Sequence, residues 1–159
     1  MNSSILRYIL VFVAALFLQA IAVRYFEIVH WKPDLVLIVL VMFSIRHGRR
    51  AGSTAGFAAG LLNDLISGGL LGLGALSRTI TGFVAGTIAL FFQDRGQFIF
   101  TLFVSGLAQD FIYFYINTLG RDVLWQVIIF VHIIPNLLYT AIVGTVIYYF
   151  LDKWLNEDD

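Results

Sequence analysis

The chain alternates long apolar runs with short polar or glycine-rich breaks along its whole length. Read against those breaks, the apolar runs predict six helical spans. They cover residues 6–23, 33–45, 51–66, 75–92, 98–118 and 126–151. A transmembrane helix needs about 20 mostly apolar residues, so a chain of 159 residues has room for six such spans and for no soluble domain beside them. We therefore expect an all-α integral membrane protein, a compact bundle of six transmembrane helices forming a single domain over residues 1–159.

The composition agrees with an integral membrane protein and excludes several classes of function. Hydrophobic residues make up 60% of the chain, charged residues only 13%, and the mean hydropathy is +0.89. Ten basic and ten acidic residues give a formal net charge of zero, so the chain lacks the basic surface that nucleic-acid binding requires. Cysteine is absent, which removes disulfides and thiolate chemistry. Function is expected to reside in or beside the bilayer, with no nucleic acid as partner.

The distribution of basic residues predicts the orientation. Six spans place both termini on one side of the membrane. The basic residues expected on that side are Arg7, Arg46, Arg49, Arg50, Arg95 and Lys153. Those expected opposite are Arg24, Lys32 and Arg121. Because cytoplasmic loops carry the excess of Lys and Arg, we expect both termini to be cytoplasmic.

The first span has a second interpretation. Arg7, the apolar run after it and the small-residue pattern at residues 20–22 also resemble a cleavable signal peptide. Cleavage would leave five spans and an external amino terminus. The side faced by the basic cluster at residues 46–50, which is expected to end the second helix, would not change.

Glycines recur every four residues on two neighbouring spans. The series Gly52, Gly56 and Gly60 leads to Asp64, and Arg78 starts a matching series on the next span. The glycines expected to permit close helix packing are Gly52, Gly56, Gly60, Gly82, Gly86, Gly106 and Gly144. We therefore expect residues 51–66 and 75–92 to lie backbone to backbone, with Asp64 and Arg78 forming an ion pair near the external headgroups.

Polar side chains within the spans fall mostly in the outer half of the expected bundle. They are Gln19, Asp34, Asn63, Asp64, Arg78, Asp110, Asn117, His132 and Asn136. This asymmetry suggests a polar pocket that opens outward above an apolar floor. The simpler alternatives are that Asp34 starts a helix, that Asp64 ends one within reach of headgroup water, and that Asp110 and the stripe of His132 and Asn136 form hydrogen bonds between helices.

Catalytic and metal-binding motifs are missing from the sequence. His30, His47 and His132 lie in different segments at different expected depths, which argues against a shared metal site. The chain has no His-Glu-x-x-His pair, no Gly-x-Ser-x-Gly context and no phosphate-binding glycine loop. A weak alternative is that Asp64 and Asp110 form the carboxylate pair of an intramembrane protease. We expect no enzyme, no cofactor and no metal.

An ordered series of residues resembles the bacterial rod shape-determining protein MreD family, most strongly from about residue 33 to 86. The matching positions are Pro33, Asp34, Leu35, the glycines from Gly52 to Gly60 with Phe57, Asp64 to Gly69, Leu71, Gly72, Leu73, Ala75, Leu76 and Gly82. Asn63 stands where the family usually has an apolar residue, and a basic residue at position 78 is not universal in it. The Asp64–Arg78 pair is therefore expected to be a local variant.

The resemblance implies a non-enzymatic scaffold in the bacterial inner membrane. Its partners would be the transmembrane helix of MreC and, through MreC, the actin-like MreB and the peptidoglycan synthases of the elongation machinery. The family is also similar in fold to the substrate-binding subunits of energy-coupling-factor transporters. The alternative function is accordingly a small-molecule binding or transport subunit that uses the outer polar pocket. The sequence also leaves open a homodimer formed through the glycine faces.

Overall fold

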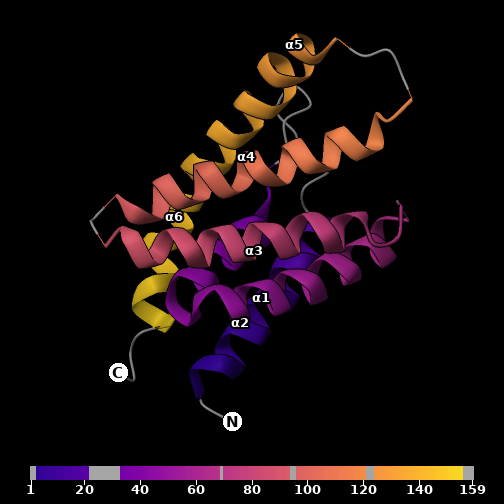
Figure 1. Ribbon diagram of the computed structural model, residues 1–159. Coiled ribbons are helices and arrows are strands. Elements are labelled where there is room, and N and C mark those ends of the chain that lie inside the picture. The colour runs from indigo at the N-terminus through magenta and orange to yellow at the C-terminus, as the bar shows by residue number, and fades with distance from the viewer. Residues whose placement is uncertain (1–2, 22–32, 69, 94–95, 121–123, 156–159) are drawn as a thin grey trace.

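Every element of the computed structural model is a helix within the described residues, which are 3–21, 33–68, 70–93, 96–120 and 124–155. The helices are α1 (Ser3–Ile21), α2 (Leu35–Ser67), α3 (Leu73–Phe91), α4 (Gln97–Asn117), α5 (Trp125–Val127), a π-helical turn (Ile128–Ile133) and α6 (Ile134–Leu155). They pack as a bundle in which α3 runs beside both α2 and α4 (Figure 1). Each of the six predicted spans overlaps one of these helical segments.

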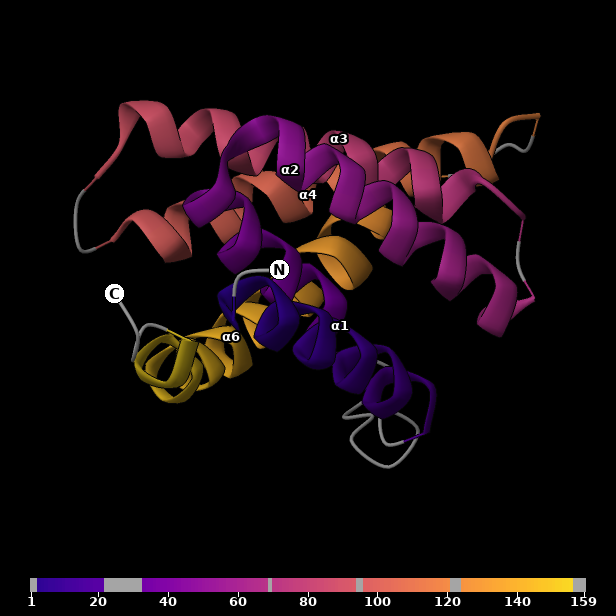
Figure 2. The ribbon, with the colours of Figure 1, turned by 90° about the horizontal axis from the view of Figure 1, so that it is seen from below.

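Helix α2 is two helices separated at Gly48. This residue has φ 81° and ψ 176°, a conformation that is almost restricted to glycine. The bend is sharp (Figure 2). It brings Gly52 in the second half directly against the side chain of Ser44 in the first. The break falls within the basic segment at residues 46–50, as the sequence predicts. It separates the second predicted span from the third.

Three helices are long and apolar enough to cross a membrane. They cover Leu73–Phe91, Gln97–Asn117 and Ile128–Leu151. The segment Ile5–Ile21 of α1 is a shorter apolar helix. The two halves of α2 are also short, as expected for residues 33–45 and 51–66. The part of the chain that the structure describes is thus all-helical, with three candidate membrane spans and one shorter apolar helix.

The second half of α2 lies backbone to backbone against α3. A Cβ atom added at Gly52, Gly56 or Gly60 would collide with a backbone carbonyl oxygen of α3, at Gly82, Arg78 or Gly74 respectively. In the reverse direction, Gly82 lies against the backbone of Gly52, and Gly86 against that of Arg49. This is the contact that the four-residue spacing of the glycines predicts.

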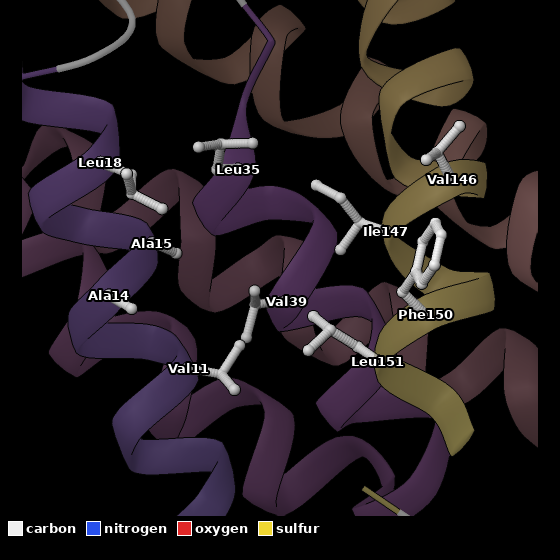
Figure 3. A pocket seen from close by; sticks show the side chains of 10 residues that line it. All are labelled: Val11, Ala14, Ala15, Leu18, Leu35, Val39, Val146, Ile147, Phe150 and Leu151. Carbon is white, nitrogen blue, oxygen red and sulfur yellow. The ribbon is translucent and has the colours of Figure 1, made fainter. Parts of the chain in front are cut away.

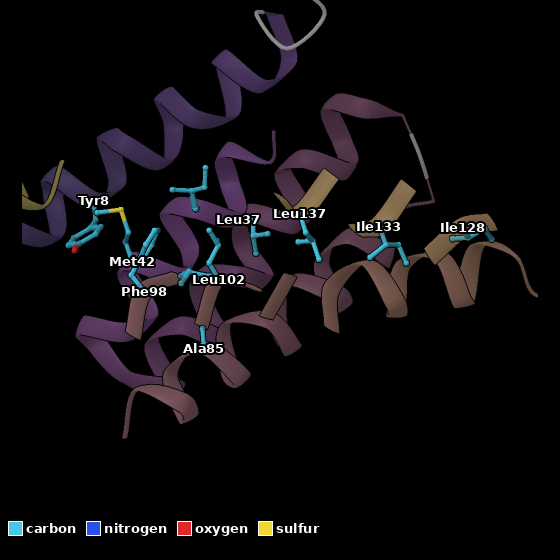
Figure 4. Close-up of a cluster of buried hydrophobic side chains, with 11 residues drawn as sticks. Tyr8, Leu37, Met42, Ala85, Phe98, Leu102, Ile128, Ile133 and Leu137 are labelled. Carbon is cyan, nitrogen blue, oxygen red and sulfur yellow. The ribbon is translucent and has the colours of Figure 1, made fainter. Parts of the chain in front are cut away.

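The core of the bundle surrounds the first half of α2. Residues 36–41 of this helix are all buried, with at most 3% of any side chain exposed. Here α1, α3, α4 and α6 pack around this segment. The main cluster joins Tyr8, Leu37, Ile38, Val41, Met42, Ala85, Phe98, Leu102, Ile128, Ile133 and Leu137 (Figure 4).

Two further glycines predicted to pack helices lie in this core. Gly106 of α4 receives the side chain of Leu137, and Gly144 of α6 lies close to the side chains of Leu102 and Ile38. These two positions therefore differ from the α2–α3 glycines, because they accommodate side chains of a neighbouring helix where the others accommodate its backbone.

Candidate functional site: a polar junction at Asp34

Asp34 forms the start of α2. The residue has extended backbone angles, and its Oδ1 accepts a hydrogen bond from the backbone N–H of Leu37 at 2.9 Å. This is the usual geometry of an N-cap aspartate, which satisfies one of the free amide groups in the first helical turn. The interpretation of Asp34 as a helix-start acid is confirmed.

The same carboxylate also joins two other helices. Arg78 of α3 donates from Nη2 to Oδ2 of Asp34 at 3.4 Å, and Gln109 of α4 donates from Nε2 to the same oxygen at 2.8 Å. Only 6% of the Arg78 side chain and 15% of the Asp34 side chain are exposed. Burial makes each charge depend on the other, because a lone charge would be costly in these surroundings.

Backbone groups beside Asp34 extend the contacts to two more helices. The backbone N–H of Asp34 donates to Oγ1 of Thr140 on α6 at 3.2 Å. The backbone N–H of Val36 donates to Oε1 of Gln19 on α1 at 3.1 Å. We call the set Gln19, Asp34, Arg78, Gln109 and Thr140 the Asp34 junction. It links α1, α2, α3, α4 and α6 at the start of the first half of α2, which the core of the bundle surrounds.

A buried polar stripe on α4 continues from the junction. Thr101, Ser105 and Gln109 are spaced four residues apart, so they share one face of α4, and all three are buried. Several of their atoms, together with two of Arg78, have no hydrogen-bond partner among the described residues. These atoms are Nε and Nη1 of Arg78, Oγ1 of Thr101, Oγ of Ser105 and Oε1 of Gln109. The junction thus holds one ion pair with hydrogen-bonding capacity to spare.

The predicted ion pair between Asp64 and Arg78 is wrong. The Asp64 carboxylate accepts three backbone hydrogen bonds, from Gly72 at 2.9 Å and from Gly74 and Ala75 at 3.2 Å each. The tight turn after α2 brings the free amide groups at the start of α3 to this carboxylate, whereas Arg78 extends to Asp34. Asp64 is therefore a cap for the next helix, supplied from the end of α2.

We expect Asp64→Ala to lower the free energy of unfolding by about 2 kcal/mol, because three backbone donors at a helix start lose their acceptor. Asp64→Asn keeps one carbonyl oxygen and should lose less. Unfolding of the purified chain in mixed micelles, followed by circular dichroism, measures both values. Equal losses in the two variants, or none in either, would contradict the capping role.

The remaining predicted site residues lie at different distances from the junction. Asp110 follows Gln109 on α4, is half-buried and interacts electrostatically with Asp34 and Arg78. Asn136 is half-buried on α6, one turn before Thr140. His132 is exposed on the π-helical turn, and Asn63 is half-buried beside Asp64. The structure therefore brings Asp110 to the junction and leaves His132 outside it.

Several of the described polar residues that the sequence assigns to an outward pocket pack against one another. A cavity of about 330 Å³ lies elsewhere, between α1, α2 and α6, and its lining is apolar (Figure 3). Sequence reasoning missed Gln109, Ser105 and Thr101 as members of the polar group. The four-residue spacing of these three side chains was the signal that could have identified them.

A family comparison shows what kind of protein carries this arrangement. The family model for rod shape-determining protein MreD matches residues 2–157. The chain belongs to the MreD family. The match extends well beyond residues 33–86, where the resemblance was strongest, and includes every helix described above. MreD membership gives the chain a role in determining rod shape, as a structural component of the cell-shape machinery. The searches of curated proteins and of solved structures gave no match.

Proposed function

We propose that this MreD-family chain is a non-enzymatic scaffold in the bacterial inner membrane that docks the transmembrane helix of MreC. Through MreC it would connect to MreB and to the peptidoglycan synthases of the elongation machinery. In this proposal all six helical segments cross the bilayer, and both termini are cytoplasmic. The start of α1 and the end of α6 lie at the same end of the bundle, which supports this arrangement (Figure 1).

The observation that carries the proposal is the Asp34 junction. It ties five helices together from inside, through contacts between residues up to 106 positions apart in sequence. Such a bundle can present its outer helix faces as fixed surfaces, because the helices are held to one another independently of any partner. A fixed surface is what a scaffold needs, since ordering a mobile one on binding reduces affinity.

Large apolar side chains are exposed on α1, α4 and α6, as they also are on α2 and α3. Phe17 on α1, Phe111 on α4 and Tyr149 on α6 are 62%, 53% and 79% exposed respectively. In a membrane, such faces contact either lipid or another helix. The glycines at residues 52–60, by contrast, are used within the chain against α3, so they do not provide the homodimer face that the sequence left open. We propose that MreC docks on α1, α4 or α6, and the test below compares these three faces.

Paired alanine substitutions on each face test the proposal. The pairs are F17A with I21A on α1, F111A with Y115A on α4, and I142A with Y149A on α6. We expect one pair to reduce recovery of MreC with the tagged chain from native membranes by about tenfold, which corresponds to about 1.4 kcal/mol of lost contact. The other two pairs serve as controls for expression and folding. Recovery of MreC unchanged by all three pairs, or no recovery with the unaltered chain, would contradict the scaffold.

A further inference from the structure

An apolar groove lies between α1 and α6. Its cavity volume is about 330 Å³, and it has α2 as its floor. The side chains that line it point into the space between the three helices (Figure 3). They are Val11, Ala14, Ala15, Leu18, Leu35, Val39, Val146, Ile147, Phe150 and Leu151. Among the residues lining this groove there is no polar side chain.

Basic residues mark one end of this groove. On α1, Arg7 lies four residues before Val11 and so continues the face that lines the groove. On α6, the exposed Lys153 lies three residues after Phe150, near the same end because α1 and α6 run in opposite directions there. At the other end, the adjoining described turns of both walls, residues 19–21 of α1 and 142–145 of α6, carry no charged side chain. Within the described residues of α1 and α6, the groove is thus apolar along its length and has basic side chains at the end near Arg7 and Lys153.

The dimensions favour an acyl chain over a helix. The groove follows α1 from Val11 to Leu18, which is about 10 Å at 1.5 Å per residue. A transmembrane helix has a diameter of about 10 Å and crosses about 30 Å of hydrocarbon, so this groove matches only a fraction of its length. Helix pairs in membranes also favour small residues at their contact, whereas Leu18, Phe150 and Leu151 are bulky.

We propose that the groove binds an acyl chain of an anionic membrane phospholipid, with the phosphate headgroup at Arg7 and Lys153. Long basic side chains extend along apolar surface and place their charge at headgroup level. The combination of an apolar groove and basic side chains at one end matches an amphiphile with one negative end. Lipid binding is measured on the purified chain without MreC, so either proposal can fail without the other.

Native mass spectrometry of the full chain tests this site. The chain is purified in detergent and exposed to equal amounts of phosphatidylglycerol and phosphatidylcholine with identical acyl chains. We expect retention of phosphatidylglycerol to exceed that of phosphatidylcholine by about tenfold, since each basic residue near an anionic headgroup strengthens attraction severalfold. R7Q/K153Q is expected to bring the ratio close to one. A14W, which places a bulky side chain in the groove, is expected to remove the bound lipid.

Two further variants separate the site from general basicity. Arg7 also takes part in an interaction within the chain, which R7Q would remove. The variant R7K/K153R keeps both positive charges with altered geometry, so it should retain the preference for phosphatidylglycerol. R49Q/R50Q removes two exposed charges from α2, outside the groove walls, and should also retain it. The proposal is overturned if R49Q/R50Q loses the preference for phosphatidylglycerol as fully as R7Q/K153Q does. It is also overturned if lipid stays bound to A14W, or if the unaltered chain retains phosphatidylglycerol and phosphatidylcholine equally. Circular dichroism of each variant verifies its fold.

Discussion

Gly56→Ala is expected to destabilise the chain by at least about 3 kcal/mol, the upper part of the range for overpacked sites. The added methyl group would collide with the carbonyl oxygen of Arg78, which belongs to the backbone of α3. A backbone carbonyl cannot move aside by changing rotamer, so α2 and α3 would have to separate. The expected sign is opposite to that of helix propensity, by which replacing a helical glycine with alanine stabilises by about 1 kcal/mol.

Gly144→Ala is the matched control, because Gly144 is also buried in the interior of a helix. There, the nearest atoms to an added Cβ are side-chain carbons, Cδ2 of Leu102 at 3.0 Å and Cγ1 of Ile38 at 3.2 Å. These can shift, so the loss should be smaller than at Gly56. Gly96→Ala adds a methyl group with no atom within 4 Å and should be nearly neutral. Denaturation in mixed micelles ranks the three. A Gly56→Ala variant as stable as Gly96→Ala would contradict the backbone contact.

The helices and the α2–α3 contact could be predicted from sequence because both leave local patterns. Apolar runs mark each helical segment, and the spacing of Gly52, Gly56 and Gly60 specifies which face must be approached closely. The conformation of Gly48 was anticipated only as a break between two helices. Its left-handed backbone explains why the break needs a glycine and produces a sharp bend.

The partner of Arg78 could not be predicted in the same way. The sequence placed Arg78 near Asp64, at the other end of a short turn, whereas its partner Asp34 lies 44 residues earlier. Pairing over that distance depends on how non-consecutive helices pack, and a sequence pattern does not specify this. The turn also offered Asp64 three backbone donors at the start of α3, which the pattern of side chains does not reveal.

The choice between Gln109 and Asp110 shows the same limit. Adjacent residues on an α-helix point about 100° apart, so only one of them can face a given neighbour directly. The sequence drew attention to Asp110 because a carboxylate within a span is unusual. The structure directs Gln109 to Asp34 and leaves Asp110 half-buried beside it. The less conspicuous residue therefore makes the direct contact.

Asp34→Asn should lower the free energy of unfolding by about 3 to 5 kcal/mol, the range for a buried ion pair that loses one partner. Asparagine still caps a helix well, so the loss reports the charge of Asp34 and not its role at the start of α2. Arg78 would remain buried with its Nε and Nη1 already lacking partners among the described residues. Chemical unfolding in micelles measures the loss, with Asp64→Asn as the comparison at a carboxylate that caps a helix without a cation.

Removing the cation as well should recover much of that loss. In D34N/R78M neither member of the ion pair is charged, so we expect the double variant to be more stable than D34N, although each substitution alone destabilises. Additive losses would mean that Asp34 and Arg78 do not stabilise each other. Asp110 provides the last test, because it is the nearby acid that could balance Arg78 once Asp34 is neutral. D34N/D110N should therefore be less stable than D34N, and in the R78M background this difference should disappear, since there is then no buried guanidinium for Asp110 to balance.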